Sequence, residues 1–73
     1  MAKTEVKSEI TGAVWKILVK PGDVVGVDEA VIILESMKME IPVLAIDGGK
    51  VTEILVKEGE AVNEGQTVAI VEV

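Results

Sequence analysis

Two segments of this 73-residue chain, 12–36 and 49–73, align without a gap at an offset of 37 residues. Eleven of the 25 aligned positions are identical, which strongly supports an internal repeat in so short a window. Two copies are too few for a solenoid, so the repeat predicts two similar units packed about a pseudo-two-fold axis. We therefore expect one domain, residues 1–73, made of the pseudo-repeats 1–36 and 38–73.

Each copy has the composition of a β-unit. Valine, isoleucine and leucine supply 26 residues and Trp15 is the only aromatic, so the core is expected to consist of aliphatic side chains, most of them β-branched, which favour strands. No helical period of apolar residues persists along the chain. We expect two small antiparallel sheets packed face to face, or a flattened barrel. The expected extended runs are 14–19, 30–35, 39–43, 51–56 and 67–73.

Turns that contain glycine are expected between these runs. KPGD (20–23) and KEGE (57–60) occupy equivalent places in the two copies, and DGG (47–49) is expected to form a further turn in which glycine supplies a positive φ. Gly65 of the second copy aligns with Asp28 of the first. If the backbone there is left-handed, Asp28 adopts that conformation at a small local cost.

The residue types that are missing exclude several classes of function. The chain has no cysteine and no histidine, so disulfides, thiolate or zinc sites and histidine-activated nucleophiles lack their usual residues. A net charge of −6, with no arginine, argues against binding to nucleic acid or to an anionic membrane surface. No signal peptide or membrane span is visible. The expected location is cytoplasmic, and no metal site or catalytic group is expected.

Lys38 lies at the junction of the two copies, because the 37-residue offset places it over residue 1. The pseudo-symmetry makes its surroundings equivalent to those of the termini, so the lysine and the termini are expected at opposite ends. Only Ser36, Met37 and Lys38 remain to connect the flanking strands, although tight hairpin turns favour Asn-Gly or Gly. A left-handed residue other than glycine costs roughly 1 kcal/mol or more. Such a break of the local rule marks a candidate functional site.

The simplest interpretation of these residues is structural, since a lone lysine is usually a solvated charge and a lone methionine usually fills a core. Strand alternation prevents Met37, Lys38 and Met39 from all pointing into one core. Part of the methionine pair is therefore expected to be exposed for a partner.

The stretch Glu35-Ser36-Met37-Lys38-Met39 resembles the Glu-Ala/Ser-Met-Lys-Met motif of the biotinyl attachment domains of biotin-dependent carboxylases and decarboxylases. The resemblance covers nearly the whole chain. It implies a flattened β-barrel or sandwich of two four-stranded antiparallel sheets with quasi-two-fold symmetry. It also implies that Lys38 carries biotin at the tip of a hairpin, with Met37, Met39 and Glu35 as motif and recognition residues. Asp28 and Ile46 depart from the family pattern at turns and leave the motif intact.

The resemblance further implies a biotin carboxyl carrier that is not catalytic alone. A biotin protein ligase would activate biotin as biotinyl-AMP and attach it to Lys38. The biotin would then carry CO₂ from a biotin carboxylase to a carboxyltransferase, as in acetyl-CoA carboxylase and fatty acid biosynthesis or in a related acyl-CoA or oxo-acid carboxylase. The sequence does not identify the acceptor.

Two other interpretations of the motif remain open. Lipoyl domains of 2-oxo acid dehydrogenase systems share the fold and the hairpin lysine, so lipoate, or both cofactors, is the alternative cargo. Asp-Lys-Ala is usual in lipoyl domains, and Met-Lys-Met favours biotin. An unmodified structural module of the lipoyl-like type is the other alternative, and the lysine motif disfavours it.

Overall fold

The computed structural model describes residues 2–73, so Met1, where the predicted domain begins, lies outside the described residues. The described residues form an all-β fold of two four-stranded antiparallel sheets, which confirms the predicted fold class. The strands are β1 (Lys3–Lys7), β2 (Gly12–Ile17), β3 (Val24–Val25), β4 (Ala30–Ser36), β5 (Met39–Leu44), β6 (Gly49–Ile54), β7 (Ala61–Val62) and β8 (Thr67–Glu72). One sheet has the order β1-β8-β6-β3 and the other has the order β5-β4-β2-β7.

The two copies have the same topology. Exchanging β1–β4 with β5–β8 converts the strand order of one sheet into that of the other. Loop hydrogen bonds repeat in the same way: the Gly22 N–H donates to the Val51 carbonyl, and the Gly59 N–H donates to the Val14 carbonyl, both at 2.7 Å. The two ends of the molecule therefore share a backbone plan, and they differ mainly in side chains.

The core lies between the two sheets and is aliphatic. Leu34 of β4 and its equivalent Val71 of β8 are almost completely buried, and Ile32 is fully buried beside them. Burying one such side chain stabilises the fold by about 1.5–3 kcal/mol. The remaining buried apolar residues are Val6, Val14, Val25, Val31, Val43, Ala45, Val51, Val56, Val62, Val68 and Ala69.

Two strands begin earlier than the sequence predicts, and glycine is the reason. The runs expected at 14–19 and 51–56 are strands at Gly12–Ile17 and Gly49–Ile54. A Cβ atom on Gly12 would lie 2.7 Å from the Glu35 carbonyl oxygen, so glycine lets the two strands approach within the sheet.

The expected positive φ in the DGG turn is wrong. The glycines with positive φ among residues 2–73 are Gly22, Gly59 and Gly65. Gly49 instead allows β6 and β8 to lie close together, because a Cβ at this position would overlap the Glu72 backbone.

Asp28 has the left-handed backbone that its alignment with a glycine predicted. Its φ is 61°, and φ of Gly65, at the equivalent place in the second copy, is 84°. The two copies thus keep the same turn, and Asp28 carries a conformational strain that Gly65 avoids.

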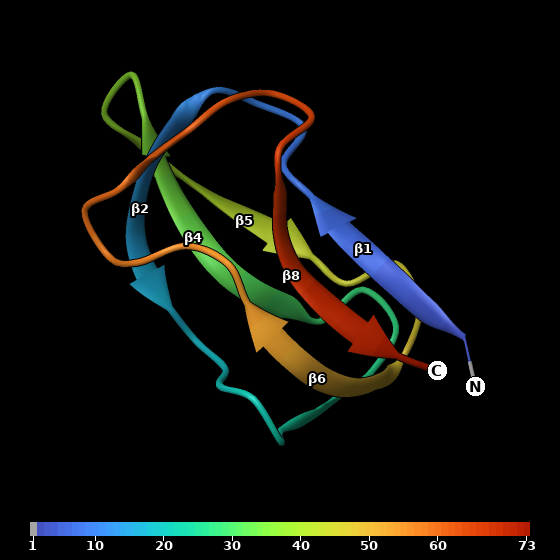
Figure 1. The fold of residues 1–73 in the computed structure, drawn as a ribbon. Coiled ribbons are helices and arrows are strands. Elements are labelled where there is room, and N and C mark those ends of the chain that lie inside the picture. Colours follow the sequence, from blue (N-terminus) through green and yellow to red (C-terminus); the bar gives the residue numbers. More distant parts are fainter. Residues whose placement is uncertain (1) are drawn as a thin grey trace.

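The β4–β5 hairpin projects at the end opposite the start of β1 and the C-terminus, as Figure 1 shows at upper left and lower right. The molecule extends 37 Å along its longest axis and 18 Å along the others. Residues 2–73 contain no helix of the length and hydrophobicity needed to cross a membrane.

Candidate functional site

The hairpin turn consists of two residues, Met37 and Lys38. The paired residues Ser36 and Met39 close it. The φ angles of Met37 and Lys38 are 52° and 64°, so both lie in the left-handed region that a type I′ turn requires and that glycine or asparagine usually fills. The predicted misfit between sequence and turn is confirmed, and it costs about 1 kcal/mol or more per residue.

The side chains at this turn point into solvent. Met37 is 92% exposed and Met39 is 58% exposed, which confirms the expectation that part of the methionine pair is exposed. Lys38 is exposed, and its amine makes no ion pair or hydrogen bond with any residue from 2 to 73. Since these three side chains contribute little to the fold, their surface is free to contact a partner.

Two glutamates face each other below the turn. Glu35 of β4 lies directly opposite Glu40 of β5, and both are exposed. Like charges in directly opposite positions destabilise an antiparallel pair. The hairpin thus combines a strained turn, an exposed apolar pair and a carboxylate pair around one unpaired amine.

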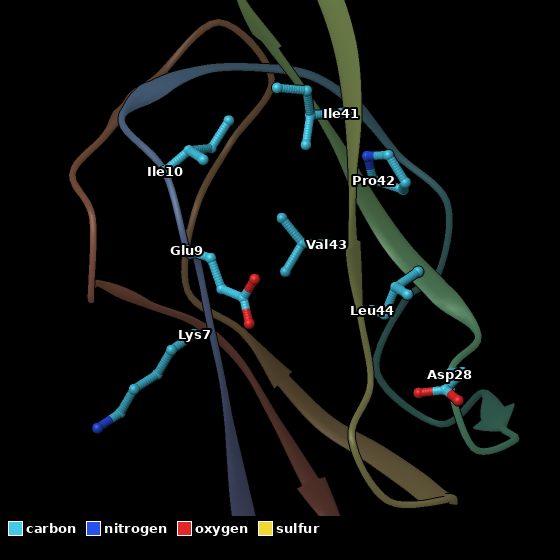
Figure 2. Close-up of a pocket in the computed structure, with 8 residues that line it drawn as sticks. All are labelled: Lys7, Glu9, Ile10, Asp28, Ile41, Pro42, Val43 and Leu44. Atoms are coloured by element: carbon cyan, nitrogen blue, oxygen red, sulfur yellow. The ribbon is translucent and has the colours of Figure 1, made fainter.

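A cavity of about 230 Å³ lies at the side of the sandwich, between β1 and β5. Figure 2 shows Ile10, Ile41 and Val43 around its apolar centre, with the Lys7 amine directed away from it. Lys38 does not line this cavity. The cavity and the hairpin turn are therefore separate features.

The chemistry available at the hairpin is that of a primary amine. The described residues hold no group of three or more His, Cys, Asp or Glu side chains placed to bind a metal ion. An exposed amine on a protruding turn is accessible for amide formation, and exposed methionine side chains form an adaptable apolar surface beside it.

A family model described as "Biotin-requiring enzyme" matches residues 3–72. The chain belongs to this family. The match confirms the predicted family, and it confirms biotin as the cofactor at the level of the family.

Similar proteins agree with this membership. The chain is 50% identical over 60 residues to the biotin/lipoyl attachment protein of Bacillus subtilis, covering 82% of each chain. It is 39% identical over 67 residues to the biotinylated protein TB7.3 homolog of Mycobacterium leprae, covering 92% of this chain and 94% of that one. The crystal structure of Kluyveromyces lactis urea carboxylase contains the same fold, with a TM-score of 0.92 and 40% identity. That match covers 99% of this chain and 6% of the urea carboxylase.

The structure brings the four predicted site residues together on one hairpin. Met37 and Lys38 form the turn, and Glu35 and Met39 flank it. Glu40 belongs with them, although the sequence did not single it out as a site residue. Positions 35 and 40 are equidistant from the centre of a two-residue turn, so exact knowledge of the turn length would have shown this pairing.

Proposed function

We propose that this protein is a biotin carboxyl carrier domain and that Lys38 is its biotinylated residue. The observation that carries the proposal is the exposed, unpaired Lys38 amine on a strained two-residue turn, in a chain of a biotin-requiring family. The domain spans residues 1–73, with pseudo-repeats 1–36 and 38–73. It is not a catalyst by itself and works as the carrier part of a carboxylase.

The chain's own residues have distinct roles in attachment. Amide formation requires a proton to leave the Lys38 amine, and the hairpin supplies no base, so the ligase has to remove that proton. The free Nζ then bonds to the carboxyl carbon of biotinyl-AMP, and AMP leaves. Loss of one positive charge takes the formal net charge from −6 to −7. Met37, Met39 and Glu35 are the residues that the ligase and the carboxylase subunits contact.

The proposed partners are a biotin protein ligase, a biotin carboxylase and a carboxyltransferase. When bound, biotin supplies the group that accepts and releases CO₂, and the exposed turn leaves it free to reach two separate active sites. The similarity to a domain of urea carboxylase supports a biotin-dependent carboxylase as the system in which this domain works. The carboxylase that we propose is an acetyl-CoA carboxylase, with a role in fatty acid biosynthesis, or a related acyl-CoA or oxo-acid carboxylase, in the cytoplasm.

The proposal is tested by intact-mass measurement after co-expression with a biotin protein ligase. One biotin per chain is expected, and Lys38→Arg is expected to abolish it, because arginine cannot form the amide. Lys57→Arg is the matched control, since it changes an exposed lysine of the other copy, and it should retain the adduct. Biotin that persists in Lys38→Arg, or no biotin in the wild type, would contradict the proposal.

Lipoate is the second candidate cargo, since the Bacillus subtilis relative is a biotin/lipoyl attachment protein. The same mass measurement with a lipoate ligase separates the two. A lipoyl adduct on Lys38 without any biotin adduct would assign the domain to lipoate transfer.

A further inference from the structure

Thr11 links three segments of the chain at the base of the lysine hairpin. The Ser36 hydroxyl, at the end of β4, donates to the Thr11 carbonyl with an O–O distance of 3.0 Å. The Glu64 N–H, in the loop between β7 and β8, donates to Thr11 Oγ1 at 3.2 Å. We call this set of two hydrogen bonds, made by Ser36, Thr11 and Glu64, the Thr11 clasp.

The other end of the molecule shows that the fold does not need the clasp. At the 37-residue offset, Ser36, Thr11 and Glu64 correspond to Val73, Gly48 and Val27. None of these three has a hydroxyl, so neither side-chain hydrogen bond can form there. The same backbone plan thus folds with the clasp at the lysine end and without it at the terminus end.

The lysine hairpin has a particular need for such a link. Both turn residues are left-handed without being glycine, so the closed hairpin is strained relative to other conformations. The Glu35–Glu40 pair adds repulsion directly below the turn. The Ser36 hydroxyl acts one residue before the turn, where it ties the strained hairpin to the rigid sandwich.

We infer that the Thr11 clasp is a positioning device: Ser36 holds the Met37–Lys38 turn in the geometry that the ligase binds. This inference rests on the proposed function for its ligase part. A protein whose binding-competent conformation is only partly populated binds with an affinity reduced by that fraction. Loss of the clasp is therefore expected to raise KM for the domain as ligase substrate and to leave kcat nearly unchanged.

The test uses Ser36→Ala, with Ser36→Thr to restore the hydroxyl. Thr52→Val is the matched control, because it removes a hydroxyl that donates to the Ile70 carbonyl at 3.3 Å in the other sheet. A neutral hydrogen bond contributes about 0.5–1.5 kcal/mol, which corresponds to a change of roughly two- to tenfold. Amide hydrogen exchange of Met39 is expected to accelerate by that factor in Ser36→Ala, and KM for biotinylation is expected to rise by a similar factor.

The two measurements separate the clasp from the proposed function. Exchange reports the hairpin without any ligase, so it tests the clasp even in a protein that takes no biotin. Ser36→Thr should return both exchange and KM to near the wild-type values, and Thr52→Val should change neither. The inference would be overturned if Ser36→Ala had the same Met39 amide exchange rate and the same KM as the wild type. Equal acceleration in Ser36→Ala and Thr52→Val would also overturn it, because it would reflect general loosening of the fold.

Discussion

The two ends of this molecule share a backbone and differ in their surfaces. At the terminus end Val27 and Ile46 are exposed, by 68% and 67%. The equivalent residues at the lysine end are Glu64 and Glu9, both exposed and charged. The two copies thus share their backbone hydrogen bonds but differ in outward side chains, and at these two positions the lysine end is acidic where the terminus end is apolar.

The strained turn lies where the other end of the molecule has the two ends of the described chain. Ser36 and Met39 close the hairpin, and their equivalents at the other end are Val73 and Ala2, where the Val73 N–H donates to the Ala2 carbonyl at 2.9 Å. The backbone therefore pairs at both ends in a similar way. At one end the paired strands are joined through Met37 and Lys38, and at the other they are the two ends of the described chain. The turn that carries the candidate site is thus the junction between the copies.

The largest effects are expected from variants that test whether both copies share one core. Leu34→Ala is expected to lower the free energy of unfolding by about 3 kcal/mol, and the equivalent Val71→Ala by about 2 kcal/mol, because the larger side chain leaves the larger cavity. Urea unfolding, followed by backbone circular dichroism and by Trp15 fluorescence, measures both losses.

Each variant should show a single transition with both probes, since residues from both copies form the one core. Lys57→Arg serves as a surface control for stability, because Lys57 is exposed. Separate transitions for the two probes would contradict the shared core, and so would a loss below about 1 kcal/mol for Leu34→Ala.

A smaller effect is expected where the two copies differ by one left-handed residue. Asp28→Gly should raise the free energy of unfolding by up to about 1 kcal/mol, because glycine adopts a φ of 61° without the Cβ strain. Gly65→Ala should lower it by about 1 kcal/mol, although a Cβ there meets no atom within 4 Å, so the loss isolates the backbone strain.

Thermal or urea unfolding measures both changes. Asp28→Gly gives the first copy the residue of the second copy, and Gly65→Ala gives the second copy a left-handed residue with a Cβ, as in the first copy. The matched control is Gly26→Ala, because Gly26 lacks a positive φ and its added Cβ would have only an ordinary contact with Glu29. Unchanged stability in Gly65→Ala would show that the left-handed backbone costs nothing at this turn.

The sequence predicted those features that depend on the repeat and on residue type. The all-β class followed from the β-branched composition, and the left-handed Asp28 followed from its alignment with Gly65. Exposure of part of the methionine pair followed from strand alternation. These signals are local or periodic, so one sequence contains them.

Other features depend on which strands pair, and one sequence does not contain that information. The role of Gly49 comes from the backbone of Glu72, which lies on a different strand. The bond from Ser36 to Thr11 joins residues 25 positions apart. Such contacts emerge only when the sheet order and the register are known.

If the lysine end carries a carboxyl group between enzymes, the biotinylated domain has to accept labelled CO₂ from a biotin carboxylase. The biotinylated domain is incubated with a purified biotin carboxylase, ATP and radiolabelled bicarbonate, and acid-labile radioactivity bound to the domain is counted. We expect stoichiometric labelling of the wild type and no labelling of Lys38→Arg carried through the same co-expression. A fully biotinylated wild-type domain that takes up no label from biotin carboxylases of the acyl-CoA, oxo-acid and urea classes would contradict it.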